Sequence, residues 1–73
     1  MSEASAEVRV TLNGEWHQLP AGSTIEFLLL RAGLVPHEVA TALNGSFVPR
    51  EQRRWQVLRD GDAVVCLQPI VGG

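Results

Sequence analysis

The stretch VRVTLNGEWHQL, residues 8–19, decides the predicted fold. Apolar and polar side chains alternate over its first five residues, which is typical of a strand with one buried face. An Asn-Gly pair follows at residues 13–14, and it favours a two-residue hairpin turn because both turn positions need a positive φ. The returning strand then pairs Leu12 with Glu15, and this register places Trp16 on the outer face of the sheet.

A short helix is predicted after the Pro-Ala-Gly break at residues 20–22. Ser23 to Glu26 fits a capping box, in which the Ser23 hydroxyl accepts a bond from a helical amide and Glu26 reaches back to the cap. The helix then runs to about Ala32, and Gly33 supplies the left-handed residue that ends it.

The predicted helix has an apolar face and two further apolar residues. The spacing i, i+3, i+4, i+7 puts four residues on the core face, namely Ile25, Leu28, Leu29 and Ala32. Phe27 and Leu30 fall on roughly the opposite side. We expect a loop or the N-terminal segment to cover them, in preference to a partner protein.

Three further strands are predicted. Residues 39–43 and 46–48 flank a second Asn-Gly turn, and residues 63–68 form a nearly continuous apolar run after an Asp-Gly-Asp turn at 60–62. Such a run is typical of a central strand buried on both faces. Pro69 cannot donate a sheet hydrogen bond, so the chain should leave the sheet there.

These elements combine into one α+β domain of two layers, with a single helix packed across a mixed sheet. The first and last strands are the apolar ones, so we expect them side by side and parallel in its middle. The domain spans residues 8–68. It lies between a disordered N-terminal segment, residues 1–7, and a flexible tail, residues 69–73, that ends in Gly-Gly.

The composition argues against several classes of protein. The chain has 73 residues, 45% of them hydrophobic, which is ordinary for one small globular domain. Its net charge of −2 gives no reason to expect a nucleic acid partner. No apolar run is long enough to cross a membrane, and the start lacks the features of a signal peptide. With a single cysteine, we expect a cytoplasmic protein without disulfides.

The side chains offer little catalytic chemistry. His17 and His37 lack partners at metal-ligand spacing, so no metal site is predicted. Cys66 lies in an apolar run and is interpreted as a buried hydrophobic residue, not a nucleophile. We therefore expect no enzyme, and the thin Gly-Gly end is the distinctive chemical feature. Four arginines belong either to a solvated loop or to a surface for an acidic partner: Arg50, Arg53, Arg54 and Arg59.

Three segments carry a resemblance to a known family. They are Leu43-Asn44 with FVPREQ at residues 47–52, DGD at residues 60–62, and QPIVGG at residues 68–73. These segments resemble the ThiS family of sulfur carriers in thiamine biosynthesis, whose members have the ubiquitin-like β-grasp fold. The family often has Trp directly after the Val-Pro-Arg-x-x stretch, whereas this chain has Arg53 there and Trp55 two residues later.

The resemblance implies a carrier that bears sulfur on its C-terminal carboxylate. An E1-like adenylyltransferase of the ThiF type would adenylate the carboxylate of Gly73 with its own ATP and Mg, so no cofactor is expected on this chain. Sulfur from a cysteine desulfurase persulfide would then replace AMP, leaving a thiocarboxylate for a thiazole synthase of the ThiG type. These partners would recognise Ile70, Val71 and Gly72. The candidate partner surface is Phe47, Val48, Pro49 and Arg50.

Three alternatives stay open at this point. The chain could be the small subunit of molybdopterin synthase (MoaD type), which shares the Gly-Gly thiocarboxylate, although the Val-Pro-Arg stretch favours ThiS. It could carry sulfur for another metabolite. It could also be a ubiquitin-like interaction module whose terminus is never activated.

Overall fold

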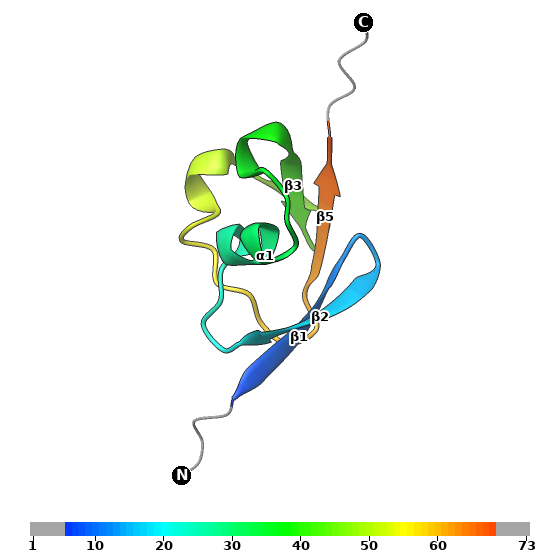
Figure 1. Ribbon diagram of the computed structural model, residues 1–73, viewed down its shortest axis with the longest axis vertical. Helices are drawn as coiled ribbons and strands as arrows, with labels where there is room; N and C mark the ends of the chain where they lie inside the picture. The colour runs from blue at the N-terminus through cyan, green and yellow to red at the C-terminus, as the bar shows by residue number, and fades with distance from the viewer. Residues whose placement is uncertain (1–5, 69–73) are drawn as a thin grey trace, which may run out of the picture.

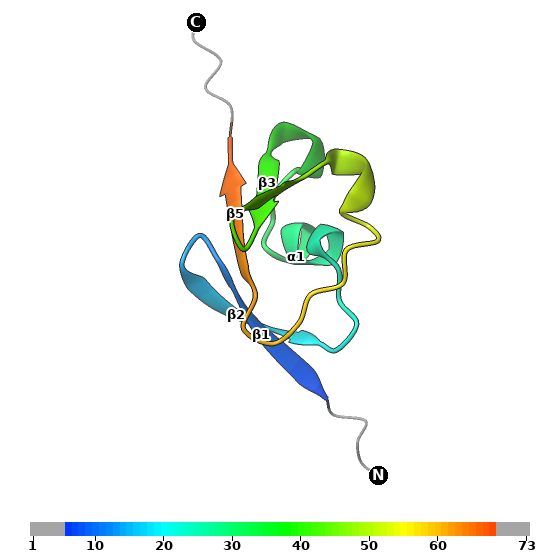
Figure 2. The same ribbon diagram turned by 180° about the vertical axis from the view of Figure 1, so that it is seen from behind.

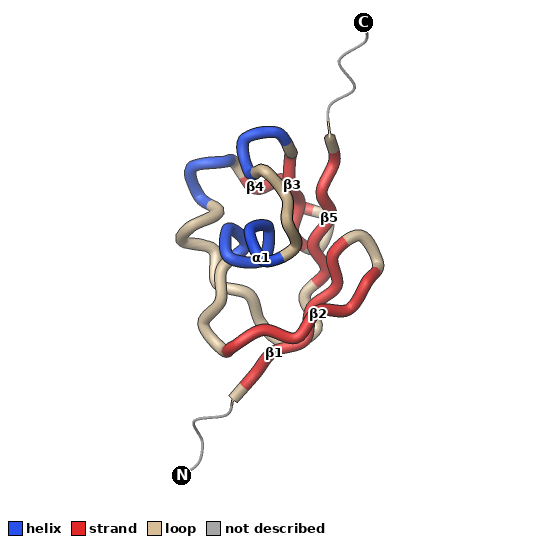
Figure 3. The backbone as a smooth tube through the Cα atoms, in the orientation of Figure 1, coloured by secondary structure: helices blue, strands red, loops and turns tan. Residues whose placement is uncertain are grey.

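The computed structural model describes residues 6–68, which form a five-stranded mixed sheet with one α-helix across one face (Figure 1). The strand order is β2-β1-β5-β3-β4. Figures 2 and 3 show the helices gathered on one side of the central strand, which leaves the opposite face of the sheet without a covering helix. The elements are β1 (Glu7–Leu12), β2 (Glu15–Pro20), α1 (Ile25–Arg31), the 3₁₀ helix η2 (Pro36–Glu38), β3 (Ala40–Leu43), β4 (Ser46–Val48), the 3₁₀ helix η3 (Arg50–Gln52) and β5 (Ala63–Leu67).

The hairpin of β1 and β2 has the predicted register. Leu12 pairs with Glu15, and the pairing continues in step to the ends of both strands. Asn13 and Gly14 have φ values of 51° and 87°, the left-handed conformation that a two-residue hairpin turn requires. Trp16 is exposed on the outer face, as predicted. β1 begins at Glu7, one residue before the predicted start of the domain.

The predicted capping box at the start of α1 is wrong by one residue. Thr24 is the N-cap, and its side-chain oxygen accepts a hydrogen bond from the Phe27 amide at 3.2 Å. The Ser23 hydroxyl instead donates to the Pro20 carbonyl at 2.6 Å. Both residues carry a hydroxyl that could cap the helix, and the contact with Pro20 decides which of them does so.

α1 ends in a Schellman motif closed by Gly33. Gly33 has a φ of 81°, and its amide donates to the Leu30 carbonyl at 3.1 Å. The amide of Leu34 donates to the Leu29 carbonyl at 2.9 Å. The predicted left-handed stop is therefore confirmed.

The core lies between α1 and the sheet. Of the four residues predicted on the core face of the helix, three are fully buried and Ala32 is exposed. Ala32 differs because the helix ends at Arg31 and Ala32 serves as its C-cap. The expectation that a loop covers Phe27 and Leu30 is wrong for the described residues, since both side chains are exposed.

β5 is the central strand. It pairs in parallel with β1, as predicted, and its other neighbour is β3, with which it pairs antiparallel. It is not buried on both faces, however, because Val64 and Cys66 point into the core while Val65 and Leu67 are exposed. α1 covers one face of the sheet and nothing within residues 6–68 covers the other. The strand therefore alternates between core and surface although all its residues are apolar.

Arg53 is buried, with 4% of its surface exposed, so its place in a surface group of arginines is wrong. Its Nε donates to the Thr41 hydroxyl at 3.0 Å. Its two terminal nitrogens donate to the carbonyls of Pro36, at 2.6 Å, and Val39. These bonds tie η3 to the turn that leads into β3. Trp55, two residues later, is exposed instead.

Candidate functional site

The predicted reactive end, Ile70 to Gly73, lies outside the described residues, so the structure defines only the strand that leads to it. Leu67, at the end of β5, pairs with the first residue of β3. On the other side, the Cys66 amide donates to the Asn13 side-chain oxygen at 2.8 Å. This bond extends the contact with β1 past the point where β1 has turned into the hairpin. The strand before the tail is therefore held from both sides.

The surface of the sheet that faces away from α1, called the open face below, is apolar near the end of β5. Phe47 of β4 lies opposite Ala42 of β3, and Ala42 lies opposite Val65 of β5. Leu67 lies two residues further along β5 and so points to the same side. Phe47 and Leu67 are 69% and 64% exposed. Neighbouring exposed apolar residues of this kind mark surfaces for protein contacts.

The structure divides the predicted partner surface, Phe47 to Arg50. Val48 is buried, so its place in that surface is wrong, and the reason is the alternation of β4, which turns it to the core opposite Thr41. Pro49 is partly exposed and Arg50 is exposed at the rim of the sheet. There a terminal nitrogen of Arg50 lies 3.4 Å from the His37 carbonyl oxygen.

Sequence reasoning missed two residues of the open face, Val65 and Leu67. The sequence does not distinguish them, because the exposed and buried positions of β5 carry the same types of residue. The signal that could have found them is the alternation of side chains between the two faces of the strand. Once β5 lies beside β1, with Val64 opposite the buried Leu12, the odd-numbered positions must face away from the core.

Cys66 is buried on the core side of β5. Burial raises the pKa of the Cys66 thiol, and the nearby positive charge of Arg53 opposes this effect only in part. A thiol with a raised pKa is almost fully protonated at neutral pH, and the protonated form is a poor nucleophile. The geometry therefore favours the interpretation of Cys66 as a packing residue.

Other kinds of site were sought within residues 6–68. That range contains no group of three or more side chains arranged to hold a metal ion. None of its helices is long and apolar enough to cross a membrane. A pocket of about 290 Å³ lies beside the hairpin, lined by Arg9, Trp16, Asp60 and Gly61. Asp60 is already engaged there, because its Oδ1 accepts from the Arg9 amide at 2.8 Å.

Comparison with known proteins identifies the family that the chain resembles. The sequence profile of the ThiS family matches residues 5–73. The sulfur carrier protein ThiS of Escherichia coli strain K12 is 33% identical over 66 residues, which cover 90% of this chain and all of that protein. A thiazole synthase of Magnetococcus marinus is 36% identical over 66 residues, and the matched part spans 20% of its length.

A solved structure of a related protein has the same fold as this chain. The crystal structure of the thiamine biosynthesis protein ThiS from Geobacter metallireducens matches this chain with a TM-score of 0.77 at 28% identity. The match covers 90% of this chain and all of that one. Together with the mixed sheet and its one crossing helix, it confirms the predicted ubiquitin-like β-grasp fold.

Proposed function

The chain belongs to the ThiS family, and we propose that it is a sulfur carrier protein that supplies sulfur for the thiazole ring of thiamine. The observation that carries the proposal is the extent of the similarity, which covers the whole length of the Escherichia coli carrier. The family match also reaches Gly73. The similarity to a thiazole synthase favours the thiazole pathway over molybdopterin synthesis or another sulfur metabolite.

In this proposal the carboxylate of Gly73 carries the sulfur. A carboxylate is a poor acyl donor, so a ThiF-type enzyme first joins it to AMP from Mg·ATP and releases pyrophosphate. The terminal sulfur of a persulfide, formed by a cysteine desulfurase, then displaces AMP. Reduction of the resulting disulfide by a thiol leaves the thiocarboxylate. The catalytic groups and the nucleotide belong to the partners, and the chain contributes a reactive end and a surface.

The residues before Gly73 form the part that enters the partners. The partners would bind the side chains of Ile70 and Val71, and Gly72 would lie in a narrow channel that leads to the partner's active site. A Cβ at residue 72 or 73 would meet the wall of a channel shaped around glycine.

In this proposal the activating enzyme binds the open face. Two features support this assignment: the residues are apolar and uncovered within the described chain, and two of them, Val65 and Leu67, lie on the strand that leads to the tail. Pro49 and Arg50 would contribute from the rim. An enzyme held there would receive the terminus directly.

Transfer of labelled sulfur tests the pathway. The chain is loaded by a ThiF-type enzyme with Mg·ATP and a radioactive sulfur donor, then offered separately to thiazole synthase with its other substrates and to the large subunit of molybdopterin synthase. We expect label in the thiazole product. Label found in the molybdopterin product alone, or loaded chain that transfers to neither enzyme, would contradict the thiazole assignment. Chain incubated without ATP is the control.

A further inference from the structure

The tripeptide Leu-Asn-Gly occurs twice in the chain, at residues 12–14 and 43–45, and forms a two-residue hairpin turn both times. Asn13 and Asn44 have φ values of 51° and 50°, and the glycines that follow them have 87° and 88°. Both asparagines and both glycines are exposed. The two turns are therefore alike in sequence and in backbone, and they differ in what their asparagine side chains contact.

Asparagine followed by glycine can react with its own backbone. The amide nitrogen of the glycine attacks the Cγ atom of the asparagine, and the new C–N bond closes a succinimide ring. The Nδ2 group leaves as ammonia and takes up the proton that the glycine nitrogen loses. Water then opens the ring at either carbonyl, which gives aspartate or, with one more carbon in the backbone, isoaspartate. Glycine permits the attack because it has no Cβ to hinder it.

The side chain of Asn44 is fixed at both ends of its amide group. Its Nδ2 donates to Oδ1 of Asp62 at 3.0 Å, and its Oδ1 accepts from the Ala63 amide at 2.9 Å. Asp62 is itself held, because its Oδ2 accepts from the Arg59 amide at 2.8 Å. Ring closure turns the side chain toward the glycine nitrogen, so at Asn44 it must break both bonds and draw the leaving amino group away from a carboxylate.

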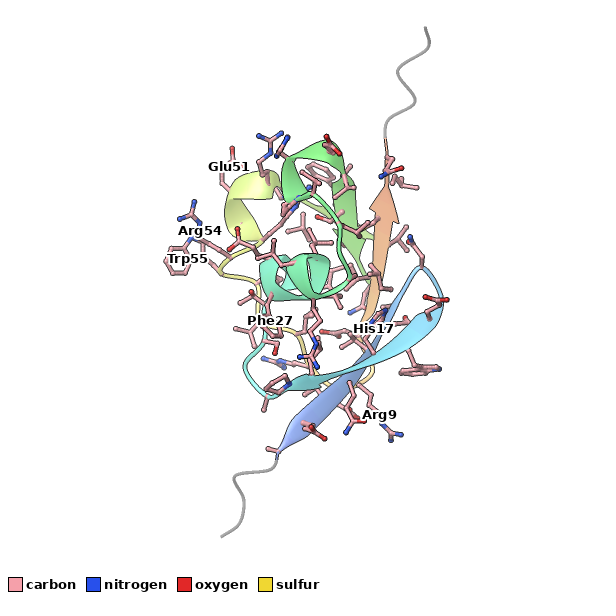
Figure 4. The ribbon with its side chains drawn as sticks, viewed as in Figure 1. Arg9, His17, Phe27, Glu51, Arg54 and Trp55 are labelled. Carbon is pink, nitrogen blue, oxygen red and sulfur yellow. The ribbon has the colours of Figure 1, made fainter. Side chains whose placement is uncertain are left out.

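The side chain of Asn13 is fixed at one end only. Its Oδ1 accepts from the Cys66 amide at 2.8 Å, and this is its one side-chain hydrogen bond within residues 6–68. Figure 4 shows the hairpin turn beside β5. An amide donor at Oδ1 polarises the carbonyl for attack, and that donor is common to Asn13 and Asn44. The difference between the two turns is therefore the bond at Nδ2.

We propose that Asn13 is a site of spontaneous modification, at which succinimide formation yields aspartate and isoaspartate. Asn44, in a turn with the same backbone, is protected by its bond to Asp62. Water is the only co-reactant, so the reaction needs no enzyme and no cofactor. The inference does not depend on the sulfur carrier function proposed above.

The modification affects β5 through the contacts of the turn. Asn13 binds β5 twice, because its backbone amide donates to the Val64 carbonyl at 2.9 Å and its side chain accepts from the Cys66 amide. Aspartate keeps the backbone and a side-chain oxygen in the same place, so both bonds persist. Isoaspartate adds a carbon to a two-residue turn and moves its carboxylate, so the hairpin register and the bond to Cys66 are no longer compatible. The isoaspartyl product therefore releases the β1 side of the end of β5.

Incubation of the folded chain in mildly alkaline buffer, followed by peptide mapping with mass spectrometry, measures both reactions in one sample. The same incubation in urea gives the ratio of rates that the sequence alone sets, because neither side chain is held there. We expect the rate at Asn13 relative to Asn44 to be about tenfold or more higher in the folded chain than in urea, which corresponds to one hydrogen bond to a charged group. A ratio no higher than the one in urea would overturn the inference.

Two variants test the protection of Asn44. Asp62→Ala removes the acceptor of its Nδ2 group, and Asn44 should then react about tenfold faster while the rate at Asn13 stays the same. Asp60→Ala is the matched control, because Asp60 lies in the same turn but its side chain accepts from the Arg9 amide instead. Circular dichroism checks that each variant is folded. An unchanged rate at Asn44 in folded Asp62→Ala, or an equal increase in both variants, would contradict the protection.

Hydrogen exchange of the Cys66 amide tests the effect on β5. The isoaspartyl form, separated by chromatography, should lose protection at this amide. Asn13→Asp carries the same charge without the extra carbon, so it should keep the protection of the wild type. Equal protection in the isoaspartyl form and in Asn13→Asp would refute the proposed effect on β5.

Discussion

Replacement of Arg53 by methionine tests whether its buried guanidinium stabilises the packing of η2 and β3 against the segment that follows η3. The head group donates to the Thr41 hydroxyl and to the carbonyls of Pro36 and Val39. Methionine keeps a long apolar stem but has no donor, so three acceptors lose their partner. Thr41 retains its own bond to the Val48 carbonyl, at 3.1 Å.

The expected loss of stability at Arg53 follows from two opposing effects. A hydrogen bond from a charged donor contributes about 1.5–3 kcal/mol, so the three bonds together contribute about 4.5–9 kcal/mol. Removal of the guanidinium also relieves the cost of burying it, which is several kcal/mol. We expect a net loss of about 2–4 kcal/mol. The whole domain should have an unfolding free energy of about 4–11 kcal/mol, from roughly 0.05–0.15 kcal/mol per residue, so this loss is a large part of the total.

Urea denaturation followed by tryptophan fluorescence measures the change, and Arg50→Met is the matched control. Arg50 is also an arginine of the η3 segment, but it is exposed and has one long contact, to the His37 carbonyl. Its replacement should change the unfolding free energy by less than about 0.5 kcal/mol. The reasoning is refuted if Arg53→Met stays within about 0.5 kcal/mol of the wild type, or if both variants lose the same amount.

Three further predictions follow from the helix cap, the thiol and the open face. Thr24→Ala should lower the unfolding free energy by about 1 kcal/mol in urea titrations, and no measurable loss would contradict its role as N-cap. Because burial raises the pKa of the Cys66 thiol, its contribution to stability is complete below the ordinary pKa of about 8.5 and is lost as the pH rises through the higher folded value. Cys66→Val should therefore flatten the fall in stability above about pH 8 while sulfur loading continues, and a fall as steep as in the wild type, or lost loading in a folded variant, would contradict this account. Val65→Thr with Leu67→Thr should raise the KM for loading about tenfold at nearly unchanged stability, and an unchanged KM would remove the open face from the contact.

Features set by neighbours in sequence were predictable. The two Asn-Gly turns, the register of the first hairpin and the stop at Gly33 depend on backbone conformations that few residues adopt. The central, parallel place of β5 also followed from its composition. In each case the local pattern and the tertiary fold favour the same answer.

Features set by individual side-chain contacts were not predictable. Ser23 and Thr24 are both good caps, and the bond from the Ser23 hydroxyl to the Pro20 carbonyl, three residues earlier, decides between them. Arg53 reads as a surface charge because its three acceptors lie 12 to 17 residues away in the sequence.

The candidate site divides in the same way. Phe47 and Val48 are adjacent and both apolar, and the pairing of β4 with β3 alone sends one to the open face and the other to the core. The terminal residues, Ile70 to Gly73, were identified by resemblance and lie outside the described residues. Their role therefore remains a prediction from family membership.

The intact mass of the chain after incubation with a ThiF-type activating enzyme, Mg·ATP and a sulfur donor tests the central claim most directly. The account predicts that the full chain gains the mass difference between sulfur and oxygen, and that a chain lacking Gly73 folds normally but gains none. A full chain whose mass stays unchanged, or a truncated chain that is loaded as well as the full one, would contradict it.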